Sequence, residues 1–141
     1  MGRLEGGCHC GNLRYVFETN KDLEALGLRA CMCTFCRRHG ARNTSDPDGT
    51  VRIRVSDVAK LNRYSFGLRT AEFLLCRECG TYIGAMLEDH DGRWMTVNVN
   101  TLLTPPGLDT PIVPNVFDAE GTATRIERRK AKWTPVVEFE A

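Results

Sequence analysis

Three cysteines within six residues are the feature that most limits how this chain can fold. They are Cys31, Cys33 and Cys36. So short a segment cannot bury three thiols in a packed core without turning them toward one point, and a metal ion is the simplest occupant of that point. Catalytic zinc sites use three protein ligands and leave one position of the tetrahedron for water or substrate. The three-cysteine segment therefore predicts a metal site with one open position.

Four further cysteines form two close pairs. Disulfide bonding explains them poorly, because the total of seven cysteines is odd and residues 1–7 contain no apolar signal core. We expect a cytoplasmic protein, and thiols in that compartment stay reduced. A redox Cys-x-x-Cys motif normally opens a helix, whereas the second pair lies between two expected strands. Metal binding is the remaining interpretation. These paired cysteines are Cys8, Cys10, Cys76 and Cys79.

A closed structural zinc site needs four ligands, and two arrangements can supply them. In the first, the paired cysteines bind one ion together and the three-cysteine segment forms a separate site. In the second, the three-cysteine segment recruits a fourth ligand, for which His9 and His39 are the nearby candidates. We favour the first arrangement because it uses every cysteine once.

Hydrophobic alternation and turn signals predict a mainly β fold of about six strands with at most two short helices. Asp91-Gly92 is the clearest hairpin turn. A short helix is expected at residues 58–61 after the capping residues Ser56 and Asp57, and residues 23–30 fit either a helical turn or a strand. The clearest expected strands span residues 12–18, 50–55, 69–75, 82–87 and 94–99.

The chain of 141 residues is expected to form one domain, residues 1–141. Its formal net charge of +1 gives no general attraction to nucleic acid or to a membrane surface. No apolar run approaches the roughly 20 residues that a membrane span requires. A basic run at residues 125–132 is not interleaved with aromatic residues, which disfavours a nucleic-acid-binding zinc ribbon. We therefore expect neither nucleic acid nor membrane as a partner.

Three motifs at these spacings are specific in combination. They are Gly7-Cys8-His9-Cys10-Gly11 followed by Tyr15, then Cys31-x-Cys33-x-x-Cys36-Arg37-Arg38, and then Cys76-x-x-Cys79-Gly80-Thr81. In this combination the chain resembles the glutathione-dependent formaldehyde-activating enzyme family, which also includes centromere protein V. The resemblance covers about residues 4–99, and residues 100–141 diverge.

The resemblance implies a tent-like, mainly β zinc fold related to that of a Rab-interacting exchange factor. It also implies two zinc ions, one held by the paired cysteines and one by the three-cysteine segment with an exchangeable fourth ligand. The implied activity is that of a carbon–sulfur lyase that forms or cleaves an adduct of a small thiol and an aldehyde, of the S-hydroxymethylglutathione type. The implied partner is a small thiol such as glutathione.

The chain also departs from the family pattern. Residues 39–43, after the arginine pair, are more polar than is usual in the family. Residues 111–117 lack the histidine of the Pro-x-x-His-Ile-Trp-like segment that many members carry. Both departures predict that the wall of the substrate site differs from the one usual in the family.

The residues beside the three-cysteine segment are candidates for handling substrate. Arg37 and Arg38 could offset the negative charge of three thiolates and bind a substrate carboxylate, or they could be a solvated surface pair. His39 could relay a proton, and Phe35 could line the pocket. An alternative function is a protein-interaction module in which both metal ions are structural. In such a module the second ion would have a fourth protein ligand and no affinity for thiols.

Overall fold

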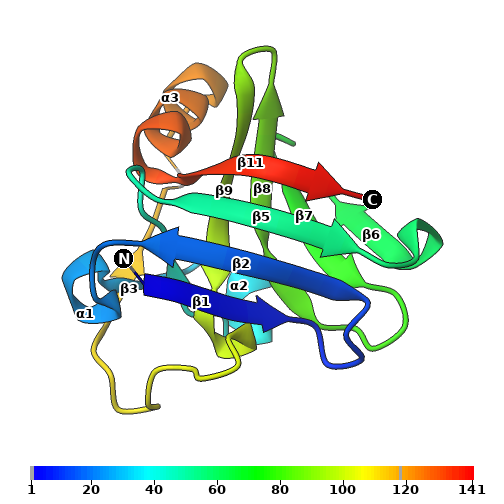
Figure 1. Ribbon diagram of the computed structural model, residues 1–141. Coiled ribbons are helices and arrows are strands. Elements are labelled where there is room, and N and C mark those ends of the chain that lie inside the picture. Colours follow the sequence, from blue (N-terminus) through cyan, green and yellow to red (C-terminus); the bar gives the residue numbers. More distant parts are fainter. Residues whose placement is uncertain (1, 118) are drawn as a thin grey trace.

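The computed structural model describes residues 2–117 and 119–141, and it consists mainly of β-strands (Figure 1). Four strands form a first sheet in the order β1–β2–β5–β11. The strand β11 runs parallel to β5, whereas the other neighbours are antiparallel. The strands are β1 (Gly2–Gly7), β2 (Leu13–Thr19), β5 (Thr50–Val55) and β11 (Thr134–Glu140).

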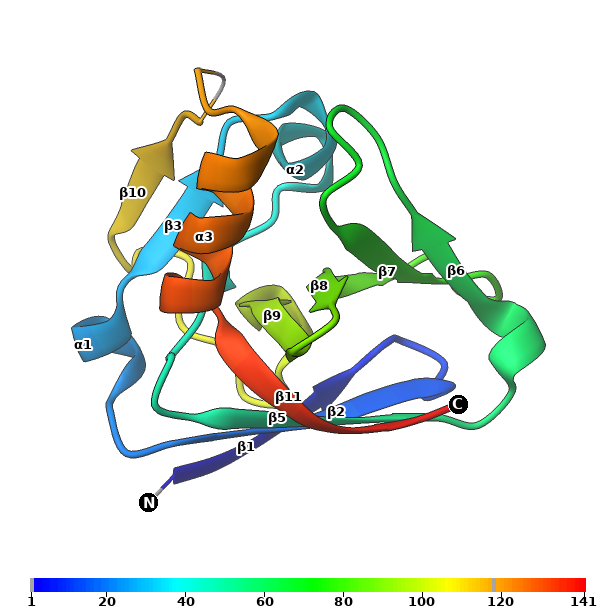
Figure 2. The same ribbon diagram turned by 90° about the horizontal axis from the view of Figure 1, so that it is seen from above.

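A second, branched sheet is joined to the first because the start of β11 also pairs with β9. One arm runs from β9 through β8 and β7 to β6, and the other runs through β4 and β3 to β10 at the edge. Seen from above, the two arms spread away from the first sheet like the sides of a tent (Figure 2). The strands are β3 (Leu28–Cys31), β4 (Asn43–Thr44), β6 (Leu61–Tyr64), β7 (Glu72–Cys76), β8 (Tyr82–Asp89), β9 (Gly92–Asn98) and β10 (Ile112–Asn115).

The core lies on both faces of the second sheet. Between the two sheets, Leu13 and Phe17 of β2 pack with residues such as Ile83 and Met95, all four of them fully buried. On the opposite face a smaller cluster contains Phe73, Tyr82, Cys36 and Trp133. Burial on both faces explains why β8 is apolar from Tyr82 to Leu87 instead of alternating.

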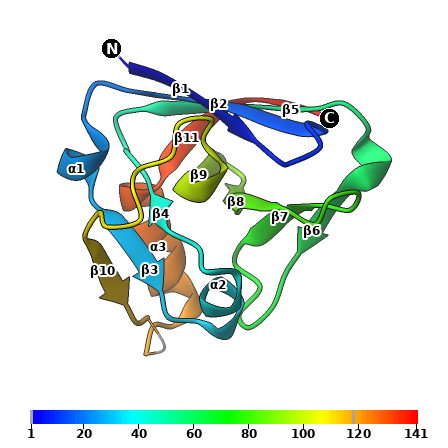
Figure 3. The ribbon, with the colours of Figure 1, turned by 90° about the horizontal axis from the view of Figure 1, so that it is seen from below.

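Helices close the open side of the tent. Viewed from below, α2 and α3 lie between the arm that ends in β3 and β10 and the arm that ends in β6 and β7 (Figure 3). The helices are α1 (Leu23–Leu26), α2 (Thr34–His39) and α3 (Thr122–Lys132). Within the described ranges, no helix is both long and apolar enough to cross a membrane.

The prediction of a mainly β fold is confirmed, but the prediction of at most two short helices is wrong. The described residues contain three α-helices, and α3 is eleven residues long. In the sequence this segment is evident only as a basic run at residues 125–132. Ile126 of the helix packs against the smaller core cluster, to which the following Trp133 belongs. Basic residues in the last turn interact favourably with the partial negative charge at the C-terminal end of the helix. Both interactions stabilise α3.

The expected strands are present, and the ambiguous segment 23–30 contains both alternatives. It forms α1 and then β3, separated by Gly27 at a φ of 79°. The described residues form eleven strands instead of about six, because short strands such as the inner strand β4 and the edge strand β10 carry little alternation. The helix expected at 58–61 is a single 3-10 turn, Val58–Lys60, in which the Asp57 side chain accepts from the amide of Ala59.

Candidate functional site

The paired cysteines lie together at the end of β7, next to the β1–β2 turn. The sulfur of Cys10 is 3.7 Å from that of Cys8 and 3.6 Å from that of Cys76, and all four sulfurs lie within 4.8 Å of one another. Four sulfurs bound tetrahedrally at about 2.3 Å would be separated by about 3.8 Å. The donor set therefore fits a tetrahedral metal ion.

The two turns present these sulfurs to polar groups. The amide of Leu13 donates to the Cys8 sulfur at 3.2 Å. Gly80 adopts a φ of 79°, which an L side chain rarely tolerates, and thereby closes the turn between Cys76 and Thr81. Burial by itself would raise the pKa of Cys79, but the Thr81 hydroxyl and backbone amides lower that pKa to about 5. The turn thus favours the thiolate that metal binding requires.

The three-cysteine segment forms a second cluster at the open side of the tent. Cys31 ends β3, Cys33 caps the N-terminus of α2, and Cys36 lies in the first turn of that helix. The amide of Cys36 donates to the Cys33 sulfur at 3.4 Å, and the three sulfurs lie within 4.8 Å of one another. In the part of the chain that the structure describes, no fourth Cys, His, Asp or Glu joins this group. The cluster could bind a metal ion and leave one position open.

The three thiols of this cluster differ in their pKa values. Hydrogen bonds with the side chains of Cys31 and Cys36 hold the pKa of Cys33 far below its usual value. Hydrogen bonds with the side chains of Cys31 and Cys33, followed by burial, raise the pKa of Cys36. Cys33 is therefore the first thiolate of the cluster.

A cavity of about 90 Å³ opens beside this cluster. Cys31 and Cys33 form one wall, and the segment that leads into β7 forms an apolar wall with Phe66 and Phe73. The third wall is cationic and comes from α3. It consists of Arg125, Arg128 and Arg129.

The candidates next to the cysteines in sequence lie elsewhere. Arg37, Arg38 and His39 are exposed, and none of them lines the cavity. The Nδ1 atom of His39 is 2.9 Å from the carbonyl oxygen of Phe35. Phe35 packs against Phe73, with ring centroids 4.6 Å apart, and does not line the cavity either. A role of these residues in binding substrate stays a prediction.

Sequence reasoning missed the arginines of α3. A usable signal was present, because positions 125, 128 and 129 are spaced i, i+3 and i+4 and therefore share one face of a helix. This spacing is informative only if residues 122–132 are first recognised as a helix.

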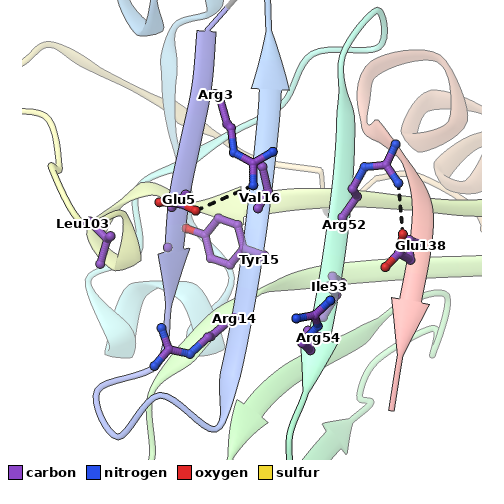
Figure 4. Close-up of a pocket in the computed structure, with 11 residues that line it drawn as sticks. Arg3, Glu5, Arg14, Tyr15, Val16, Arg52, Ile53, Arg54, Leu103 and Glu138 are labelled. Atoms are coloured by element: carbon purple, nitrogen blue, oxygen red, sulfur yellow. Dashed lines mark hydrogen bonds and ion pairs between the residues drawn. The ribbon is translucent and has the colours of Figure 1, made fainter.

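A different cavity, of about 290 Å³, lies on the outer face of the first sheet (Figure 4). It contains no cysteine among its lining residues. Three of its arginines are paired with carboxylates. Arg52 lies 3.0 Å from Glu138, Arg54 lies 3.1 Å from Glu140, and Arg3 lies 3.8 Å from Glu5. This face has the character of a solvated sheet surface, so the smaller cavity beside the three-cysteine segment is the candidate site.

Comparison with known proteins agrees with this arrangement of cysteines. The chain matches the family model described as glutathione-dependent formaldehyde-activating enzyme over residues 3–117. It is also similar to the crystal structure of a Rhodobacter sphaeroides protein solved as a structural genomics target, with 31% sequence identity and a TM-score of 0.59. That similarity covers 80% of this chain and 99% of the other chain. The family match ends before α3 begins.

Proposed function

Because the chain belongs to the glutathione-dependent formaldehyde-activating enzyme family, we propose that it forms or cleaves the carbon–sulfur bond between a small thiol and an aldehyde. One observation carries this proposal. Four cysteines make a complete ligand set, whereas Cys31, Cys33 and Cys36 offer three sulfurs beside a cavity. A purely structural metal site would need no such opening.

We infer that zinc is the metal at both clusters, because all-sulfur tetrahedral sets are typical of zinc. The paired cysteines would hold one ion and the three-cysteine segment the other. When bound to the latter, zinc supplies a position for a fourth sulfur ligand and favours the deprotonated form of a thiol.

The reaction needs no oxidant or other co-reactant. The sulfur of the thiol donates an electron pair to the aldehyde carbon and forms the new carbon–sulfur bond. The pair of the carbonyl double bond moves to oxygen, and the proton lost by the thiol ends on that oxygen. The same steps reversed release the thiol and the aldehyde.

The chain's own side chains prepare the cavity for this step. Phe66, Ala71 and Phe73 form an apolar wall that limits access of water. The positive charge of the α3 arginines stabilises the negative charge that develops on the aldehyde oxygen. The small volume favours a small aldehyde such as formaldehyde.

A second candidate function is a non-catalytic, zinc-stabilised module that binds a protein partner. It is favoured by exposed apolar side chains in the segment 103–116, among them Leu103, Leu108 and Val116. Under this alternative the three-cysteine cluster would show no affinity for thiols. Thiol binding therefore separates the two candidates.

Exchange NMR of formaldehyde with glutathione and with smaller thiols tests the proposed activity. The protein should accelerate exchange between the free aldehyde and the thiol adduct, and Cys33→Ser should remove the acceleration. If exchange rates are unchanged for every thiol tested, the enzyme proposal fails and the module remains.

A further inference from the structure

We propose that the thiol substrate also carries a carboxylate, and that Arg129 of α3 binds this carboxylate in the cavity beside Cys31 and Cys33. The inference rests on the proposed function and names the substrate class for that site. Three observations support it: the way Arg129 is held, the charge around it, and the size of the cavity.

Arg129 is fixed in place while part of its guanidinium lacks an acceptor. Its Nη1 atom donates to Thr70 Oγ1 at 2.7 Å, and the guanidinium carbon lies 4.7 Å from the centroid of the Trp133 ring. The buried Nε atom has no hydrogen-bond partner among the described residues. Buried N–H groups are normally paired, and Arg129 is one of the residues that line the cavity, so the unpaired donor suggests an acceptor supplied by a ligand. A carboxylate matches the edge of an arginine with two parallel hydrogen bonds.

The neighbouring arginines are already neutralised in part. Glu120 lies 3.3 Å from Arg125 and 2.7 Å from Arg128. No carboxylate among residues 2–117 and 119–141 lies within 4.0 Å of Arg129. Among the described residues, the α3 wall thus presents three guanidinium groups against one glutamate, which leaves an excess of positive charge.

Arg129 remains a cation despite its surroundings. Burial, followed by the charges of Arg128 and Arg125, lowers its pKa to about 10. The group is therefore protonated at neutral pH, and a bound anion would relieve the repulsion among the three arginines. Arg37 and Arg38, which are exposed and outside the cavity, cannot supply this contact from their present positions.

The size of the cavity limits the length of the ligand. Its volume of about 90 Å³ is well below the roughly 300 Å³ at which pockets that enclose drug-sized ligands begin. A mercaptocarboxylic acid of a few carbons fits this space, with its sulfur toward the cysteines and its carboxylate toward Arg129. A tripeptide thiol would leave most of its length outside.

The cationic wall lies outside the residues that the family model matches. The family match covers residues 3–117, whereas Arg129 lies in α3 at residues 122–132. Recognition of a carboxylate would therefore come from a segment beyond the matched residues. The departures of the chain from the family pattern near residues 111–117 point in the same direction.

Calorimetric titration of the purified, metal-loaded protein with three matched probes tests the inference. The probes are 3-mercaptopropionate, its neutral amide 3-mercaptopropionamide, and 3-hydroxypropionate, which keeps the carboxylate but lacks the thiol. The mercapto acid should bind at least tenfold more tightly than the amide. Arg129→Gln should abolish this preference, so that the mercapto acid and the amide bind equally, and Arg129→Lys should retain part of it.

Lys132→Gln provides the matched control. It removes one positive charge from the same helix at an exposed position that does not line the cavity, so the preference should persist. Circular dichroism and thermal unfolding establish that each variant is folded before its titration is interpreted.

The outcomes separate the inference from the proposed function. Equal binding of the mercapto acid and the amide, or an unchanged preference in Arg129→Gln, would overturn the role of Arg129 while leaving the thiol chemistry intact. Equal binding of the mercapto acid and the hydroxy acid would overturn the thiol chemistry itself, and the inference with it.

Discussion

The sulfur of Cys10 lies 3.6 Å from the sulfur of Cys76, although the two residues are 66 positions apart in the sequence. Their contact connects the β1–β2 turn to the end of β7, and so one sheet to the other. A metal ion among the paired cysteines would act as a cross-link between the two layers. The other cluster is built within a single short segment and has no such bridging role.

The two clusters should therefore respond differently to loss of a ligand. The wild-type protein is expected to bind two zinc ions per chain, and Cys33→Ser is expected to bind one while keeping its fold. Elemental analysis together with native mass spectrometry gives the count. One zinc ion in the wild type would contradict the assignment of two sites.

Cys79→Ser should destabilise the whole protein. Structural zinc binding contributes roughly 10–16 kcal/mol in small zinc domains, and this substitution removes one ligand from the bridge between the sheets. We expect a large fall in the thermal midpoint and loss of the soluble folded state at 37 °C. Cys33→Ser is the matched control, since it also replaces one thiol with a hydroxyl; similar thermal midpoints for the two variants would contradict the prediction.

Tyr15→Phe tests a buried hydrogen bond that holds the segment after β9 against the first sheet. The hydroxyl of Tyr15 lies 2.7 Å from Thr101 Oγ1, which in turn donates to the Asn98 carbonyl at 2.7 Å. Removing the tyrosine hydroxyl should lower the free energy of unfolding by about 1–2 kcal/mol. Urea unfolding measures it, and a double-mutant cycle with Thr101→Val should show that the two effects are not additive.

Asp46 should make stability depend on pH. Its carboxylate is buried and accepts from Thr19 Oγ1 at 2.5 Å and from the Asp48 amide at 2.9 Å. Burial alone would raise its pKa, but these hydrogen bonds, followed by the charge of Lys21, hold the pKa below its usual value. The stability from a lowered pKa is present above the unfolded pKa of about 3.9 and is lost as pH falls through the folded value.

The matched comparison is wild type against Asp46→Asn. The variant should be less stable by about 1–3 kcal/mol at pH 7, and the difference should shrink below about pH 4. Urea unfolding at several pH values measures the difference. Both proteins have the same cysteines, so protonation of the metal ligands cancels. A difference that stays constant down to pH 3 would rule out the lowered pKa.

Glu120→Gln should strengthen binding of carboxylate-bearing thiols. The change removes the only described carboxylate that pairs with Arg125 and Arg128, and so makes the cavity wall more positive. We expect affinity for 3-mercaptopropionate to rise severalfold with no change for its amide, as measured by calorimetry. An equal gain for both probes would indicate a change in cavity shape instead of charge.

The cysteine clusters could be predicted from the sequence because the cysteines of each motif are separated by only one or two residues. Cys76-x-x-Cys79 and the three-cysteine segment each place sulfurs together through local turns, and the grouping of the remaining pair followed from counting ligands. The alternating strand at β2 and the Asp91-Gly92 hairpin could be predicted for the same reason, since both depend on residues that are close in the sequence.

The cavity could not be predicted in the same way. Its walls come from segments around Cys33, Phe73 and Arg129, and only the pairing of distant strands brings them together. Arg37 and Arg38 are exposed on α2 and do not line this cavity, so their contact with substrate stays a prediction. The arginines that line it belong to a helix whose apolar side is limited to residues such as Ile126, so its pattern resembled a charged tail.

The direct succession of α3 and β11 ties the dynamics of the cavity to those of the sheets. Only Trp133 separates the helix that carries Arg129 from the strand that joins the two layers. Local unfolding that detaches β11 from the sheets would also move α3, which carries the arginines of the cavity wall. The two elements should therefore exchange their amide hydrogens as one cooperative unit. A ligand that spans the cavity would then slow hydrogen exchange along β11, far from the atoms it touches.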